Sequence, residues 1–227
     1  MEQEKIIISL GGSLIVPNEI DIDFLTEFKK IILSQIEKGK KFIIITGGGK
    51  TARKYQSALK EISNPSLEHL DWLGIYSTRL NAEFLELFFT GIAEEIIITD
   101  PTLPVNFEKP LVIGAGWKPG WSTDYDAVLL AKSINAKRVI NLSNIDFAYD
   151  KDPNKYPDAK KLENISWSEY RELIPKEWNP GLSTPFDPIA SGIAEDEGIE
   201  VAILNGKNIE NLENCLNNLE FIGTKIK

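Results

Sequence analysis

The stretch Ile44–Tyr55 reads IITGGGKTARKY, and it contains the change of pattern that decides the fold. Its apolar start is typical of a buried strand, three glycines follow, and the remainder has the composition of a helix. A strand that leads through glycines into a helix exposes backbone N–H groups at the helix start, where a phosphate can bind. The stretch is not a Walker phosphate loop, because the glycine that the Walker spacing demands falls on Ile44.

The same alternation of apolar runs and helical patterns covers the rest of the chain. Several runs are apolar throughout, as expected for a parallel sheet that helices cover on both faces. The alternation predicts a three-layer α/β/α sandwich with a mainly parallel central sheet, in a single domain over residues 1–227. The predicted strands are residues 4–10, 41–46, 94–99, 110–114, 137–142 and 199–204, and the predicted helices are residues 21–38, 51–62, 67–89, 122–135, 187–198 and 209–216.

Composition excludes several classes of protein. No apolar stretch reaches the roughly 20 residues of a membrane span, so we expect a cytoplasmic protein with no membrane partner. The net charge of −9 argues against a nucleic-acid partner, which requires a basic surface. The lone Cys215 rules out an internal disulfide and a cysteine zinc site, and the lone His69 argues against histidine-based triads and zinc chemistry.

Glycine clusters follow three of the predicted strands. They are SLGGSL (residues 9–14), TGGGKTAR (46–53) and GAGWKPGWSTD (114–124). In an open α/β sheet, ligands bind beyond the carboxyl ends of the strands, so these loops are expected at the site. The third cluster is not a dinucleotide fingerprint, because Pro119 takes the place of its last glycine and no acidic residue follows about 20 positions on.

The segment NLSNIDFAYDKDPNKYPDAKKL (residues 141–162) is long, acidic and irregular. Asp146, Asp150 and Asp152 do not follow the spacing of an EF-hand. Two interpretations stay open. The loop could carry the base and ribose of a nucleotide with one carboxylate near Mg²⁺, which its length favours, or it could be a solvated acidic turn.

Taken together, these segments, with DWLGIYSTRLNA (residues 71–82) and FDPIASGIAEDEGIEVAILNG (186–206), resemble the amino-acid kinase superfamily and, within it, the archaeal-type uridylate (UMP) kinases. The resemblance covers nearly the whole chain. It implies transfer of the γ-phosphoryl group of ATP to UMP, with Mg²⁺, in a homo-oligomer that is a hexamer by family resemblance. It also implies that an N-terminal part, about 1–135, binds the phosphate acceptor and a C-terminal part, about 136–227, binds ATP.

Site residues follow from the resemblance, position by position. Asp124 matches an aspartate that organises the catalytic cations, while Arg79 and Asn81 are expected only to support the site. No residue is assigned as a metal ligand. The implied catalytic residues are Asp124, Arg53 and Lys50; the ATP-binding residues are Gly11, Gly12, Ser13, Gly48, Arg53, Ser143, Asn144, Tyr149 and Asp152; the UMP-binding residues are Gly47, Asp71, Trp117, Lys118, Pro119, Gly120, Trp121, Ser122 and Thr123.

Three positions depart from the family pattern. Ser9 stands where many members carry lysine, Gly192 stands where related kinases carry the lysine of DP-x-A-x-K, and Phe147 replaces a glycine. Loss of one transition-state cation commonly lowers the rate on the order of 10²- to 10³-fold. Lys50, Arg53 and Lys118 are the candidates to replace these lysines.

The departures keep two alternatives open. One is a small-molecule kinase similar to isopentenyl phosphate kinases, which by resemblance would use a histidine and has only His69 available. The other is a non-catalytic nucleotide- or oxyanion-binding protein with a storage or regulatory role.

Overall fold

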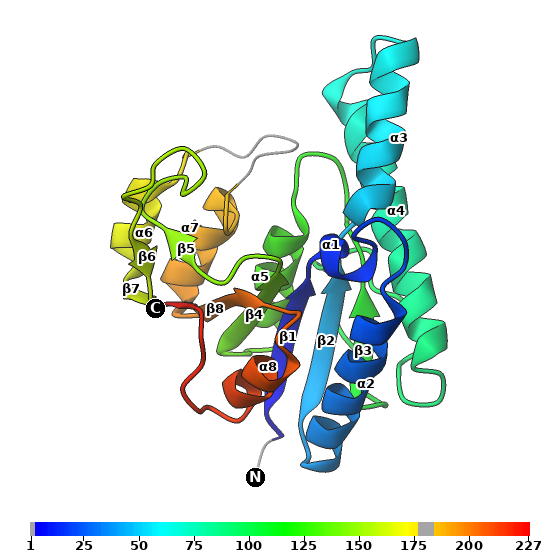
Figure 1. Ribbon diagram of the computed structural model, residues 1–227. Coiled ribbons are helices and arrows are strands. Elements are labelled where there is room, and N and C mark those ends of the chain that lie inside the picture. Colours follow the sequence, from blue (N-terminus) through cyan, green and yellow to red (C-terminus); the bar gives the residue numbers. More distant parts are fainter. Residues whose placement is uncertain (1–2, 177–183) are drawn as a thin grey trace.

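The computed structural model describes residues 3–176 and 184–227, and within them seven strands form one sheet in the order β3-β2-β1-β4-β8-β9-β7 (Figure 1). The first five of these strands pair in parallel, and β9 is antiparallel to β8. The prediction of a mainly parallel sheet is therefore confirmed. The strands are β1 (Lys5–Leu10), β2 (Lys41–Thr46), β3 (Leu111–Gly114), β4 (Arg138–Ser143), β7 (Asn164–Ile165), β8 (Glu200–Asn205) and β9 (Thr224–Ile226), and a separate hairpin joins β5 (Ala148–Tyr149) to β6 (Lys161–Leu162).

Helices cover both faces of the sheet, which confirms the three layers. Alternate residues of β1 show why, because Ile6 and Ile8 pack into one buried cluster and Ile7 into the other. Helices α2 (Ile22–Glu37), α4 (Leu67–Phe88) and α8 (Ile209–Leu216) cover the first face, with α2 and α8 in front of the sheet in Figure 1. Helices α5 (Thr123–Ser133), α6 (Trp167–Leu173) and α7 (Pro188–Glu197) cover the second.

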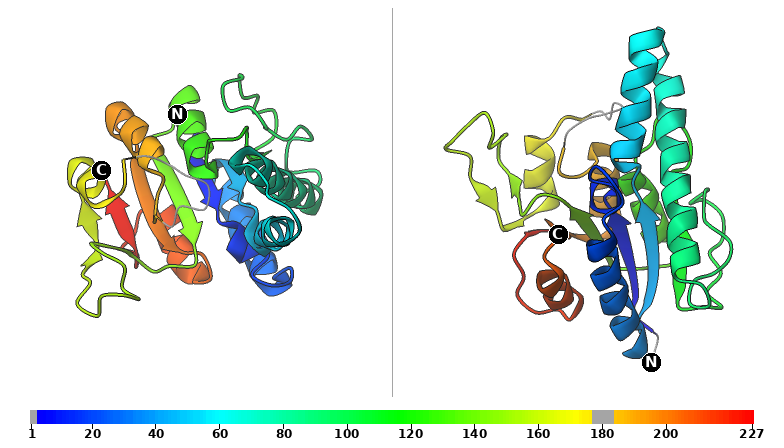
Figure 2. Two further views of the ribbon diagram at one scale, coloured as in Figure 1. Left: turned by 90° about the horizontal axis from the view of Figure 1, so that it is seen from above. Right: turned by 45° about the vertical axis from the view of Figure 1, so that its right-hand side comes forward.

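Two further helices lie at the upper edge of the sheet, where the parallel strands end. The first is α1 (Gly12–Ile15), a single turn after β1, and the second is α3 (Gly49–Ile62), after β2. Helix α3 packs along α4, and the pair rises above the sheet in Figures 1 and 2. This pair forms one wall of the space above the strand ends. In the described part of the chain, no helix is both long and apolar enough to cross a membrane.

One predicted strand is wrong. Residues 94–99 touch the sheet only through isolated bridges, from Ala93 to Leu111 and from Ile98 to Gly114. Between these points the chain turns outward and leaves Ile96 82% exposed, so the apolar run does not form a continuous ladder. The predicted helices are present with small shifts at their ends.

Several short elements lie outside the sequence prediction. Strands of two or three residues, such as β7 and β9, are too short to show a period, and their pairing depends on distant parts of the chain. Helix α6 did carry a local signal, because Ser166 and Glu169 form a capping box at its start.

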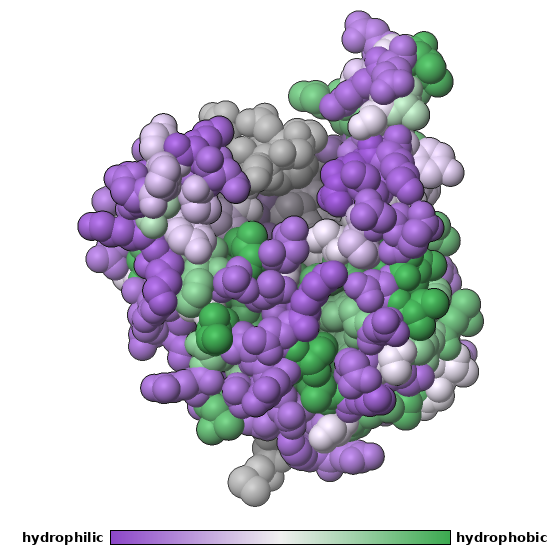
Figure 3. Space-filling view, viewed as in Figure 1, coloured by the Kyte–Doolittle hydropathy of each residue, from purple (hydrophilic) through white to green (hydrophobic). Residues whose placement is uncertain are grey.

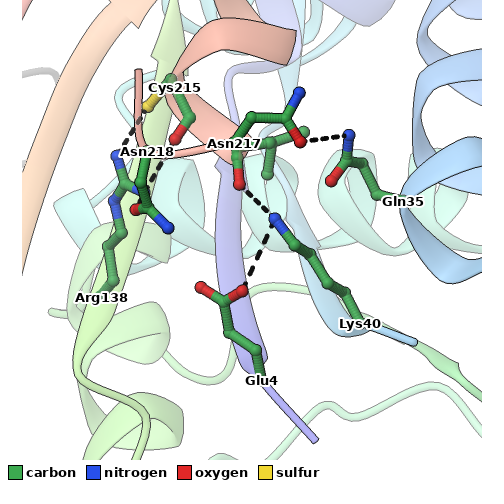
Figure 4. A network of polar contacts seen from close by, with 8 residues as sticks. Glu4, Gln35, Lys40, Arg138, Cys215, Asn217 and Asn218 are labelled. Carbon is green, nitrogen blue, oxygen red and sulfur yellow. Dashed lines mark hydrogen bonds and ion pairs between the residues drawn. The ribbon is translucent and has the colours of Figure 1, made fainter. Parts of the chain in front are cut away.

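The lower edge of the sheet holds a network of paired polar groups (Figure 4). Arg138 donates to the carbonyl of Cys215 at 2.8 Å and forms an ion pair with Glu200 at 3.4 Å. Lys40 donates to the carbonyl of Leu216 and lies 3.5 Å from the Glu4 carboxylate. Both cations thus bind the carboxyl end of α8, where the helix dipole is negative. Burial raises the pKa of the Cys215 thiol to about 11.

Candidate active site

The loops after β1 and β2 meet backbone to backbone at the upper edge of the sheet. In the parallel pairing, Leu10 lies opposite Thr46, so both loops leave the sheet at the same level. A Cβ added to Gly12 would lie 2.1 Å from the backbone nitrogen of Gly49, and one added to Gly47 would lie 2.5 Å from the nitrogen of Gly12. Gly49 also has a φ of +65°. Side chains are therefore excluded where the loops touch, and the glycines are required there.

The two helices that follow these loops differ from the others in their first turn. Neither α1 nor α3 has a side-chain cap on its N-terminal N–H groups. Each of the six other helices in the described ranges has a side-chain cap: Asp21, Ser66, Ser122, Ser166, Asp187 or Asn208. Helix α3 therefore presents N–H groups and the positive end of its dipole without a competing side chain, an arrangement that suits an anion.

Asp124 lies beside these loops, held by the two central strands. Its Oδ1 accepts hydrogen bonds from the Ser9 hydroxyl at 2.8 Å and the Asn141 amide at 2.9 Å. Ser9 and Asn141 are register partners of β1 and β4. Burial raises the pKa of Asp124 to about 7, the Ser9 hydrogen bond opposes that rise, and the charge of Asp187 adds to it. Asp124 is thus fixed in place, and its surroundings favour the protonated form more than water would.

Two more carboxylates surround Asp124. Asp187 caps α7 through the N–H groups of Ile189 and Ala190, at 2.7 and 2.8 Å, and accepts the Ser122 hydroxyl at 2.5 Å. Asp126 is only 1% exposed. Its burial raises its pKa to about 8, a hydrogen bond from Trp117 N–H opposes this, and the charge of Asp124 adds to it. Among residues 3–176 and 184–227, no lysine or arginine forms an ion pair with any of the three.

A pocket of about 240 Å³ opens between the α3–α4 pair and the loop after β3. Its lining includes Asp71, Thr78, Trp121 and Thr123. Asp71 accepts the N–H of Gly120 at 2.9 Å, which ties α4 to the loop. Burial raises the pKa of Asp71, and the Gly120 hydrogen bond opposes that rise. Of the residues expected to bind UMP, the structure places Asp71, Trp121 and Thr123 in the pocket lining, with Gly120 hydrogen-bonded to Asp71.

Stacked rings form the rest of that loop. Trp121 stacks on Tyr125 with ring centres 4.1 Å apart, and Trp117 follows at 6.5 Å from Trp121. Lys118 Nζ lies 3.7 Å above the Trp117 ring, so it is engaged in a cation–π contact. Pro119 and Gly120 turn the chain between the two tryptophans, and Gly120 has a φ of +91°.

Two of the candidates to replace the lysines missing at positions 9 and 192, Lys50 and Arg53, lie on α3, and the third, Lys118, lies in the loop after β3. Lys50 is half-buried in the first turn, and Arg53 is exposed in the next. Position 192 carries no cation: a Cβ there would lie 3.6 Å from Arg171 Nη2, and Arg171 is already paired with Glu195. Of the candidates for the missing lysines, Lys50 and Arg53 therefore lie nearest the glycine loops.

The residues expected to bind ATP lie on the other side of the glycine loops. Gly11 N–H donates to the Leu142 carbonyl at 2.8 Å, which places Ser143 and Asn144 next to the β1 loop. Tyr149 lies in β5 opposite Lys161, in the hairpin at the left of Figure 1. Asp152 lies in the turn of that hairpin and accepts the N–H of Asn154 at 2.9 Å.

Some residues of this site were missed from the sequence. Ser9 and Asn141 are polar residues inside otherwise apolar strand runs, and that pattern could have identified both as partners of Asp124. Asp126 and Thr78 gave no such signal, since each lies on a helix among ordinary neighbours. In the described ranges, no group of three or more His, Cys, Asp or Glu residues is placed to hold a metal ion.

Comparison with known proteins places this geometry in a family. The model of the amino acid kinase family matches residues 4–106 and 110–205. The chain is 38% identical to the uridylate kinase of Thermoplasma volcanium, in an alignment over 99% of this chain and 98% of that protein. It is 34% identical to the uridylate kinase of Methanobrevibacter smithii, over 98% of each.

Solved structures agree with this assignment. The crystal structure of uridylate kinase from Archaeoglobus fulgidus superposes with a TM-score of 0.81 at 30% identity and covers 98% of this chain and 100% of that one. UMP kinase from Bacillus anthracis has the same fold, with a TM-score of 0.81 at 19% identity. The glycine loops, the fixed Asp124 and these full-length matches together show that the chain belongs to the amino acid kinase family and, within it, to the archaeal-type uridylate kinases.

Proposed function

We propose that this protein transfers the γ-phosphoryl group of ATP to UMP and forms UDP. The observation that carries the proposal is the meeting of the two glycine loops, with the uncapped start of α3, between an acceptor pocket on one side and the Ser143–Asn144 strand end on the other. Two nucleotides bound on opposite sides would direct their phosphates toward the same backbone N–H groups. This is the arrangement that in-line phosphoryl transfer requires.

Each expected residue has a role in this reaction. Gly11, Gly12 and Ser13 would hold the ATP phosphates through the β1 loop, and Gly48 and Arg53 would assist from the β2 loop. Phosphoryl transfer needs positioned donors and cations more than covalent chemistry, so Lys50 and Arg53 would stabilise the transferred charge. Tyr149 and Asp152 would bind the adenosine end.

The acceptor would bind along α4. Asp71 of α4 lines the pocket together with Gly116, Trp121 and Thr123 of the segment after β3. Gly47, whose carbonyl accepts from the Asn81 amide of α4, would meet the acceptor phosphate from the β2 loop. All lining residues of this pocket fall between positions 56 and 123. That range supports the division into an acceptor-binding part, about 1–135, and an ATP-binding part, about 136–227.

Mg²⁺ fits the site as an ion that arrives with the nucleotide. The described residues offer no three-residue metal cluster, whereas Asp124 is fixed beside the glycine loops. When bound, Mg²⁺ would neutralise charge on the phosphate oxygens. Asp124 would orient the phosphate–metal assembly while Ser9 and Asn141 hold its carboxylate.

We also propose a homo-oligomer, a hexamer by family resemblance, in the cytoplasm. An apolar stripe on α4 supports the assembly: Tyr76, Leu80, Phe84 and Leu87 are 60%, 64%, 37% and 67% exposed. Their spacing of three or four residues places them along one helix face. Apolar residues gather over the α4 side of the molecule in Figure 3.

A coupled assay of ADP release over UMP, CMP, AMP and isopentenyl phosphate tests the activity. We expect turnover with UMP, and turnover confined to isopentenyl phosphate would contradict the acceptor assignment. In that case His69→Ala would report on the histidine that the alternative requires. Calorimetry showing tight ATP and UMP binding without UDP formation would instead support a non-catalytic binding protein.

A further inference from the structure

Trp117 lies in the loop between β3 and α5, here called the acceptor loop, and both of its backbone polar groups are hydrogen-bonded to side chains of other elements. Its N–H donates to Asp126 Oδ2 at 3.1 Å, and its carbonyl accepts from Arg79 Nη2 at 3.1 Å. Hydrogen bonds from Thr102 lower the pKa of Asp100, and the Trp117 side chain adds a smaller effect in the same direction. The peptide groups on both sides of this one residue are therefore fixed, one from α5 and the other from α4.

The neighbouring residues of the loop are held from α4 alone. Thr78 Oγ1 accepts the N–H of Gly116 at 2.8 Å, and Asp71 accepts the N–H of Gly120 at 2.9 Å. Both Thr78 and Asp71 line the acceptor pocket. Arg79 and Asp126 are absent from that lining, so they can act on the acceptor only through the loop.

Arg79 and Asp126 each hold a buried polar atom that the described residues do not satisfy. These atoms are Arg79 Nε and Asp126 Oδ1. Burial of an unsatisfied polar or charged atom destabilises a fold, and smaller or apolar side chains at these positions would avoid that cost. Both side chains also hydrogen-bond to the same residue, Trp117, which indicates a shared role in holding that residue.

We propose that Arg79 and Asp126 are positioning residues that set the affinity for the acceptor by fixing the Trp117 backbone from opposite sides. The inference rests on the proposed function. With Trp117 fixed, Gly116 and Trp121, which line the pocket, are held in one arrangement before the acceptor arrives. Preorganisation of this kind lowers the entropy lost on binding. The donor side of the site shares none of these contacts, so ATP binding does not depend on them.

The test compares Arg79→Met and Asp126→Ala with the conservative variants Arg79→Lys and Asp126→Asn. The Asp126→Asn variant would keep an oxygen acceptor for Trp117 N–H, and the Arg79→Lys variant would keep a charge and a donor for its carbonyl. We expect the KM for UMP to rise about tenfold in the truncated variants, since each loses one hydrogen bond that fixes the Trp117 backbone. The KM for ATP should stay unchanged, and both conservative variants should recover most of the acceptor affinity.

Hydrogen exchange of the ligand-free protein tests the same contacts without any substrate. Backbone amides in residues 114–122 should exchange at least several-fold faster in the truncated variants than in the wild type. Asp196→Asn and Lys30→Met, which change exposed groups on α7 and α2, serve as controls and should change neither readout.

Three outcomes would overturn the inference: an unchanged KM for UMP in Arg79→Met, equal rises in both KM values, or unchanged exchange in residues 114–122. If Asp126→Ala does not fold, Arg79→Met still decides the question. Failure of the proposed function would give a different result, because the wild-type protein would not convert UMP. The hydrogen exchange of residues 114–122 would still test the contacts of Arg79 and Asp126.

Discussion

The two edges of the sheet differ in how their ionisable side chains are arranged. At the lower edge, Lys40 pairs with Glu4, and both Lys40 and Arg138 bind the carbonyl end of α8 (Figure 4). Arg138 also forms an ion pair with Glu200. At the upper edge, Asp124, Asp126 and Asp187 lie together, and burial and mutual repulsion raise the pKa of the first two to about 7 and about 8. The same sheet supports both edges, so the difference does not arise from the fold itself.

The difference indicates what each edge is for. Paired charges with helix-end contacts stabilise a fold, whereas like charges held close together destabilise it and persist where a ligand compensates them. Under the proposed function, a metal–nucleotide complex would bring positive charge to the upper edge. Mutations at the two edges should therefore separate activity from stability.

The largest expected effect is from Asp124→Asn, at the upper edge. We expect kcat to fall on the order of 10²- to 10³-fold, because under the proposed function the variant loses the carboxylate that would orient the phosphate–metal assembly. Thermal stability should stay the same or rise, because the substitution removes one of three carboxyl groups that lie close together. Steady-state kinetics and thermal melting measure the two quantities. Full activity of the variant, or a fall in its melting temperature as large as that of a core mutation, would contradict the assignment of the upper edge to activity.

The next effect is from Arg138→Met, at the lower edge. Removing this cation leaves Glu200 and the Cys215 carbonyl without their partner, so the free energy of unfolding should fall by about 2–4 kcal/mol. Denaturant unfolding measures the loss, and the KM values for both substrates should stay unchanged. Arg171→Met, which removes an exposed ion pair, is the matched control and should cost less than about 1 kcal/mol. A changed KM in Arg138→Met would show that the edges are coupled.

The smallest effect is the pH dependence of stability in Asp126→Asn. The pKa of Asp126 is raised from 3.8 to about 8 in the folded protein, so the folded state holds a proton that the unfolded chain has lost. Wild-type stability should therefore fall as pH rises from about 4 to about 8. Position 126 of the variant cannot titrate in this range, so the slope of its stability against pH should be shallower by at most about 1.4 kcal/mol per pH unit. Melting curves between pH 5 and pH 8 measure this, and parallel slopes would contradict it.

The sequence predicted the regular part of the fold because its signals are local. The apolar run of β1 and the capped, amphipathic pattern of α2 each specify their element within a few residues. The run at residues 94–99 carried the same signal, yet only two bridges reach β3. An apolar run thus predicts that some of its side chains are buried. Whether the run also pairs as a continuous strand depends on how the preceding and following segments place it beside the sheet.

The site was predictable where backbone geometry requires glycine. Gly12, Gly47 and Gly49 mark the two loops in the sequence, and the structure shows why no side chain fits there. The contacts between distant residues were not predictable. Ser9 lies 115 positions from Asp124, and Asp71 lies 49 positions from Gly120.

The amino-acid sequence by itself determined the layered α/β architecture, the positions of the glycine loops and the family, because hydrophobic period and glycine spacing act over short stretches. Only the tertiary structure decided that three aspartates share one edge without a cation among the described residues, and that Arg79 and Asp126 hold Trp117 from opposite sides. Charge and hydrogen bonding depend on distance in space, and parallel crossover connections bring together residues that lie far apart along the chain.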